Sequence, residues 1–186
     1  MKVVTTLGDT ITMTLVAVAV TITLLVLRQT RSAVLVGAGS LIGYGLMVGL
    51  KHLFGRERPP AEARLLDIDT FSMPSGHAMM ATIIYGLIAV AGHHSSSWVR
   101  AHRLVLLVAP VLAVAIGWSR VYLGVHWMTD VVAGWLLGVV FVASATYVVF
   151  RTDRLGRRGS LAGSPTVAET PQSSRTDRRP GPPGKW

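Results

Sequence analysis

Three short stretches of the sequence contain the residue types that bind anions and transfer protons. They are KHLFGRERP at residues 51–59, PSGH at residues 74–77 and SRVYLGVHWMTD at residues 119–130. Arginine offers planar paired donors and lysine a compact charge, and together they suit a dianionic phosphate better than a carboxylate. Histidine adds a group that can gain or lose a proton near neutral pH. The three stretches therefore predict a phosphate site with acid–base or nucleophilic groups.

The third stretch places a histidine and a carboxylate at helical spacing. His126 and Asp130 are four residues apart, so on a helix they would be neighbours on one face. Asp130 can then accept one ring N–H of His126, which leaves the other nitrogen free as a nucleophile or a base. Arg120 precedes this pair and supplies bidentate donors. We interpret Trp127 beside them as an interfacial anchor.

The other two stretches predict the remaining groups of the site. Lys51 and Arg58 are seven positions apart, so they share a face if the helix continues until Pro59 ends it. Pro followed by Ser at residues 74–75 is typical of a helix start, where unpaired N–H groups and the helix dipole favour an anion. His77, in the first turn, is then placed to protonate a leaving oxygen.

These stretches lie at the ends of apolar segments that are long enough to cross a membrane. Of the 186 residues, 51% are hydrophobic, and the mean hydropathy is +0.50. Five segments can each cross a hydrocarbon core of about 30 Å as a helix, two of them only when their flanks are included. They are residues 10–27, 33–50, 74–92, 100–118 and 131–150. We therefore predict an all-α, polytopic integral membrane helical bundle with five spans.

The charges predict a topology and a division into two parts. Of the net charge of +9, more than half lies in residues 151–186, which hold eight bases, three acids and five prolines. We expect residues 1–150 to form the membrane-embedded domain and residues 151–186 a basic, disordered cytoplasmic tail. The positive-inside rule then places the three polar stretches on the extracytoplasmic face of the cell membrane. Anionic lipid, rather than nucleic acid, is the expected partner of the tail.

Other patterns in the sequence have plainer interpretations. There is no cysteine, which excludes disulfide and thiol chemistry, and no P-loop or dinucleotide fingerprint occurs. Glycines at four-residue spacing predict close helix packing: Gly39, Gly43, Gly45, Gly49, Gly134 and Gly138. Four histidines have no partner at catalytic spacing and are expected to be structural: His52, His93, His94 and His102. The same interpretation suits Arg56 and Arg64, although both lie close to the predicted site.

The three motifs, K-x6-RP, PSGH and SR-x5-H-x3-D, are complete and in order. With this set of motifs the sequence resembles the type 2 phosphatidic acid phosphatases, or lipid phosphate phosphatases. They are the membrane branch of a superfamily that includes bacterial acid phosphatases and vanadium haloperoxidases. The resemblance covers about residues 40–145 and implies an acid phosphatase/vanadium haloperoxidase-like core. Many members have six spans, with the lysine motif after the third, so it leaves open whether another N-terminal span exists.

The resemblance also implies a role for each site residue. His126 would attack phosphorus to form a phosphohistidine, Asp130 would hold His126, and His77 would protonate the leaving oxygen. The phosphoryl oxygens would be held by Lys51, Arg58, Ser75, Gly76 and Arg120. No metal or cofactor is implied, because the basic cluster neutralises the developing charge. The sequence alone agrees: a two-metal site would have to come from the few carboxylates of one loop, Glu57, Glu62, Asp67 and Asp69.

These observations predict hydrolysis of the terminal phosphate of an amphiphilic lipid phosphate at the outer membrane face. Candidate substrates are phosphatidic acid, phosphatidylglycerophosphate, and polyprenyl phosphates or diphosphates. The loop of residues 60–72, with Glu62, Asp67 and Asp69, is the expected specificity element. Two alternatives remain: a phosphotransferase that uses the same histidine, and a non-catalytic membrane protein that binds lipid phosphates. A haloperoxidase is a weaker third. The sequence does not specify the oligomeric state.

Overall fold

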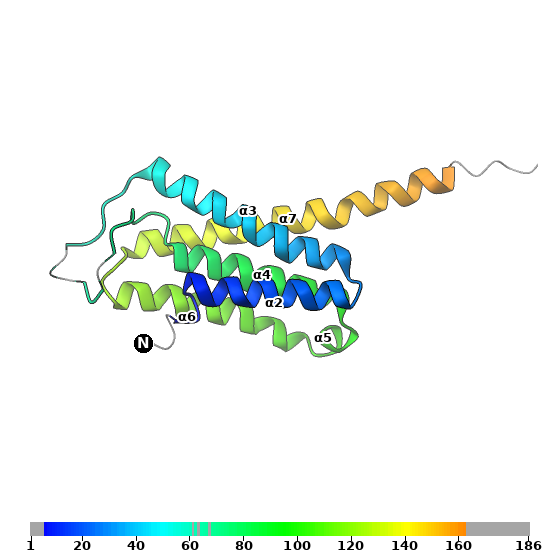
Figure 1. Cartoon of the computed structure of the whole chain (residues 1–186), viewed down its shortest axis with the longest axis horizontal. Coiled ribbons are helices and arrows are strands. Elements are labelled where there is room, and N and C mark those ends of the chain that lie inside the picture. The colour runs from blue at the N-terminus through cyan, green and yellow to red at the C-terminus, as the bar shows by residue number, and fades with distance from the viewer. Residues whose placement is uncertain (1–5, 61, 63, 67, 163–186) are drawn as a thin grey trace, which may run out of the picture.

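In the computed structural model, which describes residues 6–60, 62, 64–66 and 68–162, all regular elements are helical (Figure 1). The long helices are α2 (Thr10–Val26), α3 (Thr30–Phe54), α4 (Gly76–Ser95), α6 (Val108–Tyr122) and α7 (Met128–Ala162). Between α4 and α6 lie the short helix α5 (Ser97–Ala101) and the 3-10 helix η2 (Arg103–Leu107). The predicted all-α bundle is confirmed.

Helix α4 is the central helix of the bundle. It contacts each of the other long helices, α2, α3, α6 and α7. Its side chains Met79, Ile83 and Leu87 are fully buried, and their four-residue spacing places them on one face of the helix. The N-terminal end of α4 is therefore held where the ends of its neighbours meet.

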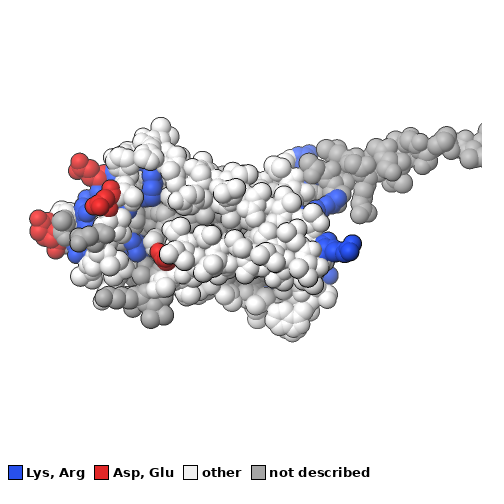
Figure 2. Space-filling model, viewed as in Figure 1, with Lys and Arg blue, Asp and Glu red and all other residues white. Residues whose placement is uncertain are grey.

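The outer surface of the bundle is apolar over the length of the helices. Four segments are long and apolar enough to cross a membrane: Thr30–Phe54, Gly76–Ser95, Arg103–Tyr122 and Met128–Arg151. Helix α2, with 17 residues, is about 26 Å long, slightly less than a typical hydrocarbon core. Figure 2 shows the charged side chains at the two ends of the bundle and uncharged atoms between them. The chain is thus a multi-pass membrane protein.

Helix α3 ends earlier than the sequence predicted. Gly55 follows Phe54 with φ of 54°, and its N–H bonds to the Lys51 carbonyl at 3.0 Å. This left-handed conformation is a common helix end and favours glycine. Because the helix stops four residues before Arg58, Lys51 and Arg58 do not share a helix face, and that expectation was wrong.

Helix α7 differs from the prediction at both ends. It begins at Met128, so His126 precedes the helix, and the expected His126–Asp130 contact crosses its first turn. It continues to Ala162, beyond residue 150, and its last turns extend away from the bundle (Figure 1). Residues 163–186 lie outside the described residues, so disorder of the tail stays a prediction.

Several of the predicted packing glycines lie at contacts between helices. A Cβ added to Gly39 would come within 2.7 Å of Leu87, and one added to Gly43 within 3.0 Å of Ile83. A Cβ at Gly138 would meet Thr82 at 2.7 Å and the Met79 carbonyl at 3.1 Å. A Cβ at Gly134 would approach a backbone oxygen of residue 75 at 3.0 Å. By contrast, Gly45 and Gly49 have nothing within 4 Å in the described part of the chain.

This difference gives a matched pair of substitutions. Gly138→Leu should lower the melting temperature in detergent, because the new side chain would force α7 away from α4; overpacking of this kind costs about 1–3 kcal/mol. Gly45→Leu adds the same side chain facing open space and should leave the melting temperature near wild type. Equal melting temperatures for the two variants would contradict the α4–α7 contact described here.

Candidate functional site

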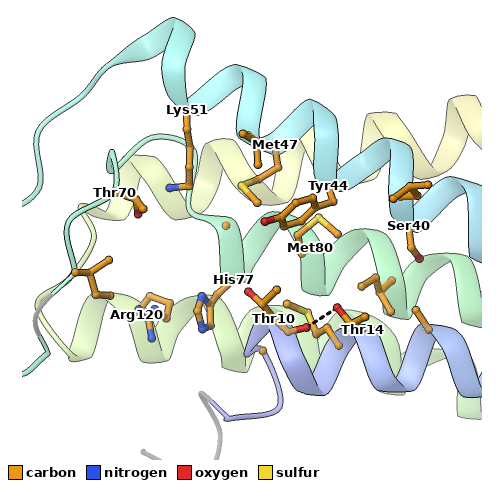
Figure 3. Close-up of a pocket in the computed structure, with 18 of the residues that line it drawn as sticks. Thr10, Thr14, Ser40, Tyr44, Met47, Lys51, Thr70, His77, Met80 and Arg120 are labelled. Carbon is orange, nitrogen blue, oxygen red and sulfur yellow. Dashed lines mark hydrogen bonds between the residues drawn. The ribbon is translucent and has the colours of Figure 1, made fainter.

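A cavity of about 930 Å³ lies between α2 and α3, with α4 as its floor (Figure 3). Its polar end is lined by Lys51, Arg58, His77, Arg120 and His126. Most of its remaining wall is apolar and includes Met13, Ala17, Val18, Leu41, Met47, Val48, Met80 and Ile84. The same cavity thus joins a cationic end to an apolar channel that runs along the helices.

His126 lies in the turn between α6 and α7 and is only 4% exposed. Its Nε2 is 3.2 Å from Nη1 of Arg58, and its Nδ1 is 3.5 Å from Oδ2 of Asp130. Arginine only donates hydrogen bonds, so Nε2 must be the acceptor in this pair. The proton of the neutral ring therefore sits on Nδ1, toward Asp130, and the Nε2 lone pair points to Arg58 at the polar end of the cavity.

Asp130 is fully buried, and donors surround both of its oxygens. Ser72 Oγ donates to Oδ2 at 2.5 Å, and the Trp127 N–H donates to the same oxygen at 3.0 Å. Nη1 of Arg56 donates to Oδ1 at 2.7 Å. A buried carboxylate remains ionised only when hydrogen bonds and positive charge replace water in this way. The pair of His126 and Asp130 is thus held rigidly from outside the cavity.

Burial lowers the pKa of His126 to about 4. The hydrogen bond with Asp130 opposes this shift, while the positive charges of Arg58, Lys51 and Arg120 add to it. At neutral pH the ring is therefore uncharged, and its Nε2 lone pair is available as a nucleophile.

Backbone carbonyl groups hold the cationic side chains at the cavity wall. Lys51 Nζ donates to the Phe71 carbonyl at 2.6 Å, and Arg58 donates to the carbonyls of Thr70 and Val125 at 2.6 and 2.7 Å. Carbonyl groups fix these cations without neutralising them, so their charge can attract an anion. Arg120, in the last turn of α6, is buried beside His77 at the same end (Figure 3).

The N-terminal end of α4 adds a second kind of anion-binding group. Ser75 precedes the helix and is completely buried, and its Oγ makes no hydrogen bond within the described residues. Such an unpaired buried hydroxyl costs about 1–3 kcal/mol. The N–H groups of Gly76 and His77 belong to the first turn, where intrahelical acceptors are lacking. Hydroxyl, amides and helix dipole together suit a tetrahedral oxyanion.

The structure brings the three predicted stretches together at one end of the bundle. Six of the predicted residues line the cavity: Lys51, Arg58, Gly76, His77, Arg120 and His126. The other two, Ser75 and Asp130, lie behind its wall. Of the expected specificity residues, Asp69 lines the cavity and Glu62 is exposed, while Asp67 lies outside the described residues.

Two partners of Asp130, Ser72 and Arg56, were not expected from the sequence. Ser72 was not singled out, although it stands only three residues before Ser75. Arg56 was expected to be merely structural. The available signal was its position, because it is a positive charge on the face that the positive-inside rule keeps poor in such residues.

An apolar helical bundle with a cationic, histidine-containing cavity at one end defines the class of membrane protein to which this chain belongs. The family model described as the PAP2 superfamily matches residues 32–154. The chain belongs to this superfamily, and the resemblance seen in its motifs is confirmed.

Individual relatives agree with this assignment. A crystal structure described as the first transmembrane PAP2 type phosphatidylglycerolphosphate phosphatase, from Bacillus subtilis, matches with a TM-score of 0.69 and 32% identity. The match covers 83% of this chain and 75% of that one. Phosphatidylglycerophosphatase B of Bacillus subtilis is 42% identical over 49% of this chain and 45% of its own length.

A third relative carries a different name. Decaprenylphosphoryl-5-phosphoribose phosphatase of Mycobacterium tuberculosis is 34% identical over 60% of this chain and 58% of its own length. The chain thus spans about half the length of the curated relatives it matches.

The burial of His126 predicts an unusual titration. In protein with ¹⁵N-labelled histidine in detergent, the ring of His126 should titrate near pH 4, where an ordinary histidine titrates near pH 6.5. Because the pKa is lowered, the ring stays neutral between pH 5 and 8 and gains a proton only as the pH falls through about 4. A spectrum of His126→Gln assigns the signal. Titration near pH 6.5 would show that the ring is not held in this buried environment.

Proposed function

We propose that this protein is an integral membrane phosphatase that removes the terminal phosphate from a lipid phosphate or diphosphate through a phosphohistidine. One observation carries the proposal. A neutral, buried His126 lines a cavity whose polar end also gathers Lys51, Arg58 and Arg120, with its Nε2 next to Arg58, and whose remainder is an apolar channel. The relatives named above as phosphatases support the same activity.

The geometry suggests a role for each group in a two-step reaction. The phosphoryl oxygens bind to the cationic side chains, to Ser75 and to the first turn of α4. Nε2 of His126 attacks phosphorus, and the bond to the leaving oxygen breaks as His77, which takes up a proton beside the bound dianion, gives that proton to the leaving oxygen. Water then attacks the phosphohistidine and loses a proton to the now neutral His77. Inorganic phosphate leaves, and His126 returns to its neutral form with Nδ1–H toward Asp130.

The cavity favours an amphiphilic substrate. Along α3 its wall runs from Lys51 to Gly37, which is about 21 Å of helix at 1.5 Å per residue. A phosphate at the polar end would leave an attached acyl or prenyl chain in the apolar channel between α2 and α3. Phosphatidic acid, phosphatidylglycerophosphate, and polyprenyl phosphates and diphosphates share this combination. The names of the relatives include both glycerolipid and polyprenyl substrates.

The charges at the ends of the bundle support a site on the extracytoplasmic side. The end opposite the site carries Arg28, Arg31, Arg100 and Arg103, which the positive-inside rule places in the cytoplasm with the tail. The basic residues of the site end have another role in this proposal, because they bind phosphate. They also supply the charge stabilisation that a metal ion provides in other phosphatases, so we propose that no metal is required.

A phosphate-release assay on the purified protein in detergent with EDTA tests this function. The wild type should release phosphate from members of a panel of lipid phosphates and diphosphates. His126→Ala should lose activity by at least about 10³-fold because the nucleophile is removed, and His77→Ala should lose about 10²–10⁴-fold because the general acid is removed. His102→Ala, at the opposite end of the bundle, serves as the control and should behave as wild type.

Other results of this assay would favour the alternatives. Full activity in His126→Ala would reject the phosphohistidine, and a strict requirement for Mg²⁺ would reject the metal-free mechanism. A phosphotransferase would transfer the phosphoryl group to an added acceptor hydroxyl instead of releasing it. A non-catalytic protein would bind the lipid phosphates without turnover, and its binding would survive His126→Ala but not Arg120→Ala.

The proposed topology has a separate test, which uses the absence of native cysteine. Leu65→Cys places a thiol in the loop at the site end, where Leu65 is 66% exposed. An impermeant maleimide should label it on intact cells. Ala101→Cys, exposed in α5 at the opposite end, should react only after the cells are permeabilised. The reverse pattern would place the site on the cytoplasmic side.

A further inference from the structure

Arg56 lies at the site end but does not line the cavity. Five basic side chains gather at this end: Lys51, Arg56, Arg58, Arg64 and Arg120. Three of them line the cavity, whereas Arg56 and Arg64 do not. Nη1 of Arg56 lies 2.7 Å from Oδ1 of Asp130 and 2.7 Å from Oγ1 of Thr129. A phosphate-binding role therefore does not account for Arg56, and its contact with Asp130 needs another explanation.

The two oxygens of Asp130 have separate partners. Oδ1 accepts the hydrogen bond from Arg56, while Oδ2 accepts those from Ser72 and from the Trp127 N–H. Of the two carboxylate oxygens, Oδ2 is the one nearer to Nδ1 of His126, at 3.5 Å, and Ser72 Oγ lies 3.4 Å from the same nitrogen. Because each oxygen is bonded on its own side, the carboxylate cannot rotate, and Oδ2 stays toward the imidazole.

We propose that Arg56 is a positioning residue that acts on His126 through Asp130. Arg56 fixes the plane of the carboxylate from behind, and Ser72 fixes its other oxygen. The carboxylate then holds Nδ1–H of His126, so that Nε2 points into the cavity. The kinetic consequence rests on the function proposed above, whereas the orientation and protonation of His126 are properties of the protein itself.

Two simpler roles for Arg56 predict different behaviour. As a structural clamp, Arg56 would join the loop after α3 to α7 and stack over Trp127, where its Cζ is 5.7 Å from the ring centroid. Loss of a clamp lowers the melting temperature and leaves kcat of the folded protein and the Nδ1–H tautomer of His126 unchanged. As a direct phosphate ligand, Arg56 would change KM rather than kcat.

The expected change in titration follows from the charges around His126. Asp130 from α7 attracts a proton to the ring, while Arg58 from the loop, Lys51 from α3 and Arg120 from α6 repel it. His77 from α4 faces the same cavity end. Removing the charge of Arg56 leaves Asp130 less neutralised, so the carboxylate attracts the ring proton more strongly. The pKa of His126 should therefore rise toward its ordinary value of about 6.5.

The test compares Arg56→Gln, Arg56→Lys and the control Arg64→Gln. Arg64 belongs to the same loop, and its Nε bonds to the Pro59 carbonyl rather than to Asp130. Arg56→Gln should lower kcat by about 100-fold, as small misplacements of a reacting group do, with KM within about twofold of wild type. It should also raise the pKa of His126 in the ¹⁵N titration. Arg56→Lys keeps the charge, so its kcat and its His126 pKa should both lie closer to the wild-type values. Arg64→Gln should match wild type in kcat and in the His126 pKa.

The outcomes separate this inference from the proposed function. If Arg56→Gln lowers only the melting temperature, or raises only KM, the positioning role is wrong. If Arg56→Gln does not fold, Ser72→Ala removes a donor from Oδ2 and should give the same fall in kcat and rise in pKa; no change there would overturn the proposal. If the wild type hydrolyses no substrate, the proposed function fails, and the tautomer of His126 in the ¹⁵N spectra of the variants decides the role of Arg56.

Discussion

The buried carboxylate of Asp130 is the constraint on which the site depends. A charge in this position requires donors, and the chain supplies them from two segments that are distant in the sequence, through Arg56 after α3 and Ser72 before α4. The backbone carbonyl of Asp130 also accepts the N–H of Ser75 at 3.0 Å, which joins the start of α7 to the start of α4. Satisfying one carboxylate therefore brings together the segments that carry all three motifs.

The cavity connects this polar assembly to the membrane. Helix α4 is packed on every side, and Gly134 and Gly138 let α7 approach its N-terminal half closely. Helices α2 and α3 stand apart enough to leave the apolar channel that begins at Lys51. Tight packing around α4 can fix a reacting group in place. The open channel between α2 and α3 can accommodate a ligand with a long apolar chain.

Sequence spacing predicted the composition of the site better than its geometry. The lengths of the apolar segments predicted the long helices. The three motifs predicted eight site residues, all of which lie at one end of the bundle. The predicted helical contacts were less accurate, because Gly55 ends α3 before Arg58 and α7 begins after His126. The roles of Arg56 and Ser72 depend on contacts across 74 and 58 positions of the sequence. A single sequence has no periodic signal for contacts of this kind.

The same charges that hold an anion also keep the proposed nucleophile ready. Arg58, Lys51 and Arg120 help to lower the pKa of His126, so that the ring of the protein itself is neutral near pH 7. A bound dianion would offset these charges and stabilise a positive charge on the ring. The ring gains such a charge when Nε2 forms a bond to phosphorus. In the proposed reaction the cations thus favour the neutral nucleophile in the free protein and, through a bound phosphate, the cationic ring as the bond forms. Asp130, fixed from behind, stabilises that ring without moving.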